Sequence, residues 1–337
     1  MSKPLVALPA LIADVGGTNA RFSLVDETGE MSPPISCAVA SHRDVADAIA
    51  DFVLPALPVK PRSFVPALAT AIKGESIKLT HAHWTFTPRD LIARFGFDDV
   101  ILLNDFEALA LALPSLTPDA LKPIGTPRPP ANGPKLVVGA GTGFGVGALM
   151  PAGDAWLPIS TEGGHLTYGP ATERDFAIWP HLPRTVGRTE VEAVLAGKGI
   201  VNLYTAIATT DGVPVEALGV GEIVDRARAG TDPVAAEAIR LFTAHTGRQT
   251  GDMALLYLPL GGVYIGGGVV ARLGDLFDDW TFRSAFDDKE PFRKLMESIG
   301  TSIIVHPCPA LVGIAALVTE PQRYLVDLTG RHWTRSD

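Results

Sequence analysis

The stretch ADVGGTNARFSLVDETG, residues 13–29, places an acid, two glycines and a threonine between two apolar runs. The run before it, residues 11–15, and the run after it, residues 22–25, have the composition of two short strands joined by a glycine turn. Folding alone does not require an acid at the end of a strand, followed by glycines and a threonine in that order. The stretch therefore predicts a hairpin whose turn also binds something.

A second stretch repeats this arrangement. When VGAGTGFGVGAL (138–149) is aligned with DVGGTNARFSLV (14–25), Gly141-Thr142 falls on Gly17-Thr18. Glycine lets the backbone take unusual conformations and approach a ligand closely, and successive N–H groups can then converge on an anion. The pair predicts two similar halves that hold parts of a polyphosphate chain, although two ordinary tight hairpins would give the same pattern. Only the first repeat carries an acid, Asp14, and one carboxylate suits a hydrated Mg²⁺.

Composition limits the class of protein. The chain has 337 residues, of which 47% are apolar and 19% charged, and this is typical of a soluble globular protein with room for two cores. A net charge of −9 argues against binding to a nucleic-acid backbone. Two cysteines exclude a disulfide framework or a cysteine-rich zinc site, and they fit a reducing compartment. The apolar start is short and broken by prolines, so neither a signal peptide nor a membrane span is expected, and we predict a cytoplasmic protein.

The order of predicted elements indicates an α/β fold. A continuous apolar strand over residues 99–103 is followed at once by a helix that stops near Pro114. The Pro- and Gly-rich segment 117–135 predicts a loop or a crossover, and the tail 320–337 is polar and predicted to be loosely held. The other predictions are a helix over 44–57, strands over 64–71 and 77–79, mainly helix over 189–255, and a helix over 309–319.

Polar side chains suited to hydroxyl chemistry follow these elements. Asn104 and Asp105 come directly after the strand 99–103, where ligands bind in α/β sheets. Asp105 could accept a proton from an attacking hydroxyl, or it could simply cap the next helix. Glu162 and His165 flank two glycines and could bind neighbouring hydroxyls of a sugar, or they could form a surface turn. Glu192 falls on a predicted helix, where an exposed glutamate is normally only solvated.

The pair His81 and His83 has the spacing of two metal ligands on one face of a strand. No cysteine or further histidine stands nearby to complete a set. We interpret the two as an exposed or hydrogen-bonded pair.

Together these motifs resemble a known family. DVGGTNAR (14–21), LLNDF (102–106), GAGTGFGV (139–146), EGGH (162–165), VLAGKGIVNLY (194–204), FRSAFDDK (282–289) and IGGGVVAR (265–272) are similar to stretches of the ATP-dependent, non-ROK bacterial glucokinases. This family belongs to the hexokinase–actin–Hsp70 superfamily. The motifs span about nine-tenths of the chain.

The resemblance implies a two-domain ribonuclease H-like (actin-like ATPase) fold around a cleft. A small α/β domain would comprise 1–115 and 307–337, and a larger α+β domain 116–306. The implied reaction transfers the γ-phosphoryl group of ATP to the C6 hydroxyl of D-glucose, the first step of glycolysis.

The resemblance also implies roles for individual residues. Asp105 would be the general base, Asp14 would hold Mg²⁺, and domain closure would exclude water. Glucose would bind to Asn104, Asp105, Glu162, His165 and Glu192. ATP would bind to Ala13, Asp14, Val15, Gly16, Gly17, Thr18, Asn19, Arg21, Gly141, Thr142, Gly143, Gly266, Gly267 and Gly268.

The sequence departs from the family at some positions, and other functions stay open. His81 stands where these enzymes usually have asparagine, so hexose preference is open, with mannose or fructose as alternatives. A non-catalytic sugar sensor or an actin-like ATP-binding module is a different class of alternative. The resemblance implies small-molecule substrates and a homodimer, with no nucleic-acid or membrane partner.

Overall fold

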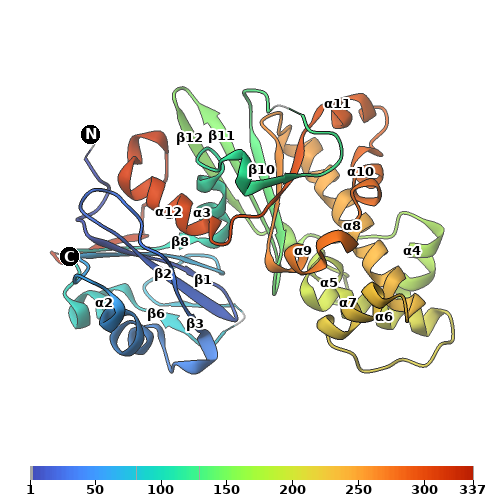
Figure 1. Ribbon diagram of the computed structural model, residues 1–337, viewed down its shortest axis with the longest axis horizontal. Helices are drawn as coiled ribbons and strands as arrows, with labels where there is room; N and C mark the ends of the chain where they lie inside the picture. The colour runs from blue at the N-terminus through green and yellow to red at the C-terminus, as the bar shows by residue number, and fades with distance from the viewer. Residues whose placement is uncertain (1–2, 81, 129, 337) are drawn as a thin grey trace. The chain divides into compact units, whose positions relative to one another are not determined.

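The computed structural model describes residues 3–80, 82–128 and 130–336. The chain forms two compact units (Figure 1). The first contains Met1–Ala120, Gly147–Ser160 and His306–Asp337, and the second contains Leu121–Val146 and Thr161–Val305. The boundaries predicted from the sequence, 1–115 with 307–337 against 116–306, stay a prediction.

The first unit is built on a mixed seven-stranded sheet. The hairpin predicted from the opening stretch is confirmed, because β1 pairs antiparallel with β2 from Ala10↔Val25 to Val15↔Ala20. β4 pairs in parallel with β1, β7 and β8. The order is β15-β7-β4-β1-β2-β3, with β8 also on β4, and the strands are β1 (Ala10–Val15), β2 (Asn19–Val25), β3 (Ile35–Ala38), β4 (Ser63–Leu68), β7 (Asp99–Ile101), β8 (Leu103–Asn104) and β15 (His332–Thr334).

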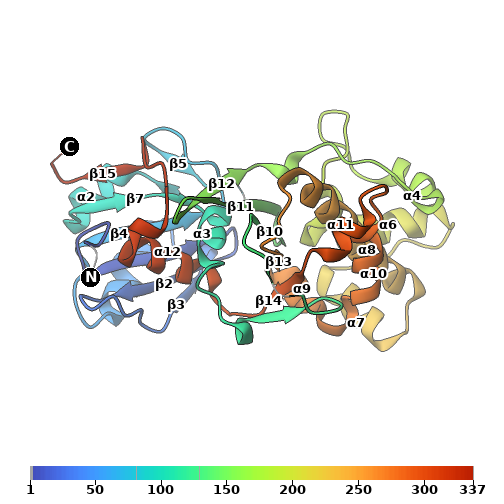
Figure 2. The same cartoon turned by 90° about the horizontal axis from the view of Figure 1, so that it is seen from above.

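Helices cover both faces of this sheet (Figures 1 and 2). α3 (Asp105–Ala112) and α12 (Pro309–Thr319) pack against each other on one face, and α2 (Pro88–Phe95) lies on the other. The two helices approach closely because a Cβ on Gly313 would stand 2.0 Å from the carbonyl oxygen of Ala108. The predicted helix over 309–319 is confirmed. A small hairpin of β5 (Ile77–Lys78) and β6 (Thr85–Phe86) completes the unit.

The segment 44–57 is helical as predicted, but it is not one regular α-helix. It consists of α1 (Val45–Asp47), a π-helical turn η2 (Ala48–Val53) and a 3₁₀ turn η3 (Leu54–Ala56). The amide of Leu54 donates to the carbonyl of Ile49, the wide spacing of a π-helix. Pro55 lies in the final 3₁₀ turn and has no N–H to donate, so a regular α-helix cannot continue through it.

The second unit contains the strands β10 (Lys135–Ala140), β13 (Val263–Gly266), β14 (Thr301–Ile304) and β9 (Leu121–Pro123), neighbours in this order. β11 (Phe144–Ala152) and β12 (Ala155–Thr161) extend the sheet beyond β10, and the boundary between the units falls within β11. The segment 117–135 was predicted to be a loop or a crossover, and the chain does pass from the first unit to the second within it, between Ala120 and Leu121. β9 lies within it and pairs antiparallel with β14, so a distant strand supplies the hydrogen bonds that the local sequence does not.

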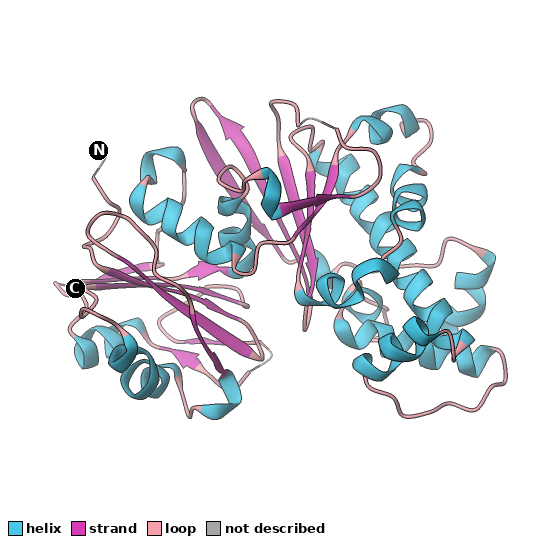
Figure 3. Cartoon of the chain, in the orientation of Figure 1, coloured by secondary structure: helices cyan, strands magenta, loops and turns pink. Residues whose placement is uncertain are grey.

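The rest of the second unit is mainly helical, as predicted for residues 189–255 (Figure 3). The long helix α8 lies at its centre, and its Gly247 allows α10 to approach, since a Cβ there would meet the carbonyl of Phe282 at 2.2 Å. The helices are α4 (Glu173–Ile178), α5 (Glu192–Leu195), α6 (Gly197–Thr210), α7 (Val220–Ala229), α8 (Pro233–Tyr257), α9 (Gly268–Leu273), α10 (Asp279–Asp287) and α11 (Arg293–Ser298).

The prediction that the tail 320–337 is loosely held was wrong. β15 pairs antiparallel with β7, and Trp333 is buried in the core of the first unit. The Tyr324 hydroxyl donates to the carbonyl of Leu111 at 2.9 Å, and His332 Nε2 lies 2.8 Å from Asp99 Oδ1. The polar composition of the tail gave no sign of this attachment, because within residues 320–336, the described part of the tail, Tyr324 and Trp333 are the only buried side chains.

No helix among the described residues is long and apolar enough to cross a membrane.

A buried polar cluster in the second unit gives a stability prediction. His245 is fully buried, its Nε2 lies 3.3 Å from Asp175 Oδ1, and its Nδ1 lies 3.0 Å from the Tyr168 hydroxyl. Burial lowers the pKa of the His245 imidazole, and Asp175 offsets this effect only in part. The unfolded chain therefore takes up this proton near pH 6.5, whereas the folded chain takes it up only at lower pH. The free energy of unfolding should fall as the pH drops below about 6.5.

The test is urea unfolding at pH 7.5 and pH 5.5 for the wild type and His245→Gln. We expect a smaller loss of stability in the variant, by up to about 1.4 kcal/mol per pH unit. His181→Gln is the matched control, because His181 is exposed. Equal losses in all three proteins would contradict the prediction.

Candidate active site

In the first unit, the predicted phosphate and sugar residues end strands of one sheet at the same edge. The register aligns Asp14 with Ala67 and Ala67 with Leu103, and one step further it aligns Val15 with Leu68 and Leu68 with Asn104. β4 is the only strand between them, so their backbones are roughly 10 Å apart. The strand order thus brings together two motifs that are 90 residues apart in sequence.

Asn104 is the N-cap of α3, directly before its first residue, and is held by several hydrogen bonds. Its Oδ1 accepts from the amides of Phe106 at 3.0 Å and Glu107 at 3.1 Å, and its Nδ2 donates to the carbonyl of Thr70 at 3.3 Å. The suggestion that Asp105 caps this helix was wrong, because Asn104 takes the N-cap position. One Nδ2 hydrogen of Asn104 is left over from these bonds.

Asp105 is therefore the first residue of α3, and its side chain is half-buried. Its Oδ1 accepts from the amide of Phe106 at 3.0 Å. The positive end of the helix dipole favours an ionised carboxylate here. The arrangement gives a carboxylate fixed at a helix start, beside an amide with a spare donor.

The turn after β1 combines closely approachable backbone with one acidic side chain, that of Asp14. The amide of Gly16 donates to the carbonyl of Asn19 at 3.0 Å, which closes the turn. Asp14 and Arg21 form an ion pair at 3.4 Å, and burial raises the pKa of the Asp14 carboxyl by more than Arg21 lowers it. Ala13 and Val15 are buried in the sheet, whereas Thr18 and Asn19 are exposed and Gly17 is half-buried.

The glycine turn of the second unit, between β10 and β11, has a similar closure. The amide of Gly141 donates to the carbonyl of Gly143 at 2.8 Å, and Thr142 at the tip is exposed. A Cβ on Gly141 would meet no atom of the chain within 4 Å, and one on Gly16 would meet only the Asn19 carbonyl oxygen, at 3.5 Å. Gly16 and Gly141 do not have a positive φ. Folding therefore does not explain why glycine stands at these two positions.

The triple glycine Gly266–Gly268 follows β13, which pairs with β10 through Gly139↔Gly266. Gly267 has a φ of +94°, and a Cβ there would lie 2.2 Å from the carbonyl oxygen of Ala140. Gly268 begins α9 and has open space where a side chain would be. Gly267 is thus needed by the fold, whereas Gly268 leaves room beside the strand end.

Two segments with predicted sugar residues meet the start of β11 in the second unit. Glu192 begins α5 and is buried, and its Oε1 accepts from the amide of Phe144 at 2.9 Å. A Cβ on Gly164 would lie 2.0 Å from the carbonyl oxygen of Phe144 and 3.2 Å from Glu192 Cγ. Glu162 and His165 stand on either side of this contact and are exposed. The interpretation of Glu192 as an exposed helix residue was therefore wrong.

The structure adds a partner for His165 that the sequence did not indicate. His165 Nδ1 lies 3.2 Å from Glu190 Oε2, and Arg188 forms an ion pair with Glu190 at 2.7 Å. Arg188 also donates to the carbonyl of His165 at 2.6 Å. These contacts fix the His165 ring, and they join positions more than twenty residues apart. The sequence signal that could have indicated these contacts is RTEVE (188–192), in which two glutamates alternate with other residues after an arginine.

Nothing in the described parts of the chain points to a metal site made of protein ligands alone. No three side chains of His, Cys, Asp or Glu come together there as metal ligands. His81 lies outside the described residues, and His83 Nε2 lies 2.9 Å from the carbonyl of His42, so His83 is hydrogen-bonded.

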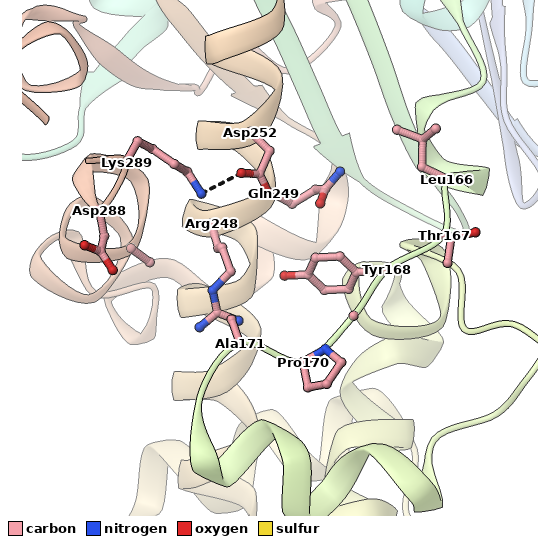
Figure 4. A pocket seen from close by; sticks show the side chains of 12 residues that line it. Leu166, Thr167, Tyr168, Pro170, Ala171, Arg248, Gln249, Asp252, Asp288 and Lys289 are labelled. Atoms are coloured by element: carbon pink, nitrogen blue, oxygen red, sulfur yellow. Dashed lines mark ion pairs between the residues drawn. The ribbon is translucent and has the colours of Figure 1, made fainter. Parts of the chain in front are cut away.

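A pocket of about 610 Å³ in the second unit begins at Leu166, the residue after His165 (Figure 4). None of the predicted site residues lines it. Its wall includes Tyr168, Arg248 and Lys289. Lys289 is paired with Asp252 at 2.7 Å, and Arg248 donates to the buried Asp175 at 2.9 Å. Because both cations have carboxylate partners, the pocket does not offer a free positive site.

Comparison with known proteins gives a consistent result. The family model described as Glucokinase matches residues 11–321. A protein named glucokinase from Mesorhizobium japonicum is 41% identical over 96% of both chains, and one from Agrobacterium fabrum is 38% identical over 97% of both.

Solved structures agree with this match. The crystal structure of a glucokinase from an Antarctic psychrotroph has a TM-score of 0.79 and 28% identity, covering 92% of this chain and 98% of that one. A glucokinase from Balamuthia mandrillaris in complex with glucose, at 21% identity and a TM-score of 0.76, covers 92% of this chain and 93% of its own, and it supports the fold alone. These matches confirm the predicted family and fold class. The chain therefore belongs to the glucokinase family and is an ATP-dependent hexose kinase.

Proposed function

We propose that this chain transfers the γ-phosphoryl group of ATP to the C6 hydroxyl of D-glucose, with Asp105 as the general base. The observation that carries the proposal is the shared edge of the first unit's sheet, where the Asp14–Gly16 turn and the pair Asn104-Asp105 flank β4. A phosphate site and a hydroxyl site must be neighbours for transfer, because most of the catalysis is positioning and charge stabilisation.

Asp105 accepts the proton of the C6 hydroxyl as the oxygen attacks the γ-phosphorus. Its place at the start of α3 keeps it ionised, because the helix dipole favours negative charge there. Asn104 donates its spare Nδ2 hydrogen to a neighbouring hydroxyl. Glu162, His165 and Glu192 bind the remaining hydroxyls, with the His165 ring held in place by Glu190.

The glycine turns hold the polyphosphate. Gly16, Gly141 and Gly268 have little or nothing of the chain where a Cβ would stand, so phosphate oxygens can approach the backbone of these turns closely. Thr18 and Thr142 add hydroxyl donors, and Arg21 adds a positive charge within reach of the same turn. The residues Ala13, Val15, Gly17, Asn19, Gly143, Gly266 and Gly267 shape these turns.

Mg²⁺ fits the donor set, because this ion keeps most of its waters and binds through one or two carboxylates and the substrate phosphates. Asp14 would hold it, and its half-buried carboxyl, whose pKa is raised by burial more than Arg21 lowers it, supports a cation partner at this position. When bound, Mg²⁺ neutralises charge on the β- and γ-phosphates.

Asp14→Asn should raise the KM for Mg·ATP by about tenfold or more and leave the KM for glucose unchanged, because one charge-assisted contact is lost. Steady-state kinetics with each substrate varied in turn checks this. The matched control is Asp51→Asn, an exposed aspartate outside the proposed site, which should behave like the wild type. A KM for Mg·ATP within twofold of the wild type would remove Asp14 from the nucleotide site.

The experiment that tests the proposed function measures ADP formation with Mg·ATP and D-glucose, mannose, fructose or no sugar. We expect strong turnover with glucose and little without sugar. Turnover with another hexose instead would keep the mechanism and change the substrate. If no sugar raised ADP release above the background, the proposed kinase activity would be rejected in favour of a non-catalytic sugar- or ATP-binding sensor.

A homodimer, a cytoplasmic location and a role in the first step of glycolysis belong to the same proposal and rest on the family resemblance. Sedimentation equilibrium of the purified chain tests the first of these.

A further inference from the structure

The C-terminal strap, residues 324–336, lies against the strand that leads into Asn104 and Asp105. β15 pairs with β7 from His332↔Ile101 to Thr334↔Asp99. One residue after β7, the amide of Leu102 donates to the carbonyl of Arg331 at 3.0 Å. The strap therefore borders the chain up to two residues before Asn104.

Glu107 connects this strap to the proposed sugar site. It is the third residue of α3 and only 3% exposed, and its Oε2 accepts from the backbone amide of Asn104 at 3.3 Å. A carboxylate buried to this degree needs a charged partner. Arg331 supplies it with two parallel bonds, Nη1 to Oε2 at 2.6 Å and Nη2 to Oε1 at 3.2 Å.

Arg331 is itself fixed at both ends. Its backbone amide donates to the carbonyl of Leu328 at 2.9 Å, and its Nε donates to the carbonyl of Asp327 at 2.9 Å. A guanidinium held in this way is a rigid fork, which a lysine cannot reproduce. It fixes the position of the Glu107 carboxylate as well as its charge.

We propose that Arg331 is a positioning residue for the sugar site, acting through Glu107 on Asn104 and Asp105. The inference rests on the proposed function of these two residues. Asn104 uses both its backbone N–H and its side-chain amide in fixed hydrogen bonds, so a shift of Glu107 must move the donor that faces the sugar. Asp105 is the next residue and moves with it. A displacement of about 1 Å at such a site can cost roughly 10²-fold in rate.

The test compares Arg331→Lys and Arg331→Ala with the wild type in steady-state kinetics. We expect kcat/KM for glucose to fall about tenfold for the lysine variant and more for the alanine variant, while the KM for Mg·ATP stays unchanged. Millimolar guanidinium should restore part of the activity of Arg331→Ala, whereas equal sodium chloride should not. Arg335→Ala is the matched control, because Arg335 lies in the same strap and pairs with Asp98, away from Asn104.

A purely structural role would lower the melting temperature but leave the constants of the folded enzyme unchanged. Since Arg331→Ala leaves a buried carboxylate unpaired and could fail to fold, Glu107→Gln/Arg331→Met removes both charges together. This double variant should fold and still show a reduced kcat/KM for glucose. Wild-type values of kcat/KM for glucose in both Arg331→Lys and the double variant would overturn the inference.

Failure of the proposed function looks different. In that case the wild type shows no sugar-dependent ADP formation, or Asp105→Asn matches the wild type. The inference alone fails when these two proteins behave as proposed and the Arg331 variants do not differ from the wild type.

Discussion

Asp105→Asn is expected to lower kcat by roughly 10²–10⁴-fold, the usual contribution of a general base. The amide cannot take the proton of the C6 hydroxyl, yet it has almost the same shape as the carboxylate. Asn104 holds the N-cap of α3 through its own side chain, so the helix start does not depend on the Asp105 carboxylate. The KM for Mg·ATP should stay close to that of the wild type. Steady-state kinetics and a melting curve of the same preparation check these expectations.

Glu173→Gln is the matched control for this variant. Glu173 is also the first residue of a helix, α4, and it is exposed. The control loses one negative charge near a helix N-terminus, which costs about 0.3–1 kcal/mol at most, and its activity should be normal. An Asp105→Asn enzyme with near-normal turnover and an unchanged melting temperature would exclude Asp105 as the base.

The second large effect separates the two glycines of the β10–β11 turn. Gly141→Ala should fold normally, because its Cβ meets no atom of the chain within 4 Å. It should nevertheless raise the KM for Mg·ATP by roughly 10–100-fold, since the new methyl group occupies the space proposed for a phosphate, and each lost charge-assisted bond costs about 1.5–3 kcal/mol. The KM for glucose should not change.

Gly143→Ala should give the opposite result. Its Cβ would lie 2.2 Å from Glu192 Oε1, so the methyl group must displace this carboxylate from the Phe144 amide. The KM for glucose should therefore rise more than the KM for Mg·ATP, and the melting temperature should fall. Kinetic constants and melting curves of both variants check the pair. If Gly141→Ala bound Mg·ATP normally, this turn would not contact the nucleotide.

The sequence by itself determined the local parts of the site. The glycine turns, the helix start at Asn104-Asp105 and the helix over 309–319 all follow from short-range signals. These are apolar runs, glycines, a capping residue and a proline, and each acts within a few residues of itself. For the same reason, the family resemblance could be drawn from motifs alone.

Tertiary structure decided which distant segments meet. Glu107 and Arg331 are 224 residues apart, and no local signal says that a polar tail supplies the partner of a buried acid. Glu190 beside His165, β9 beside β14 and the burial of Glu192 were missed for the same reason. Such an ion pair or strand pairing forms only when folding brings two distant segments within hydrogen-bonding distance. The local sequence of either segment does not indicate which other segment will be its partner.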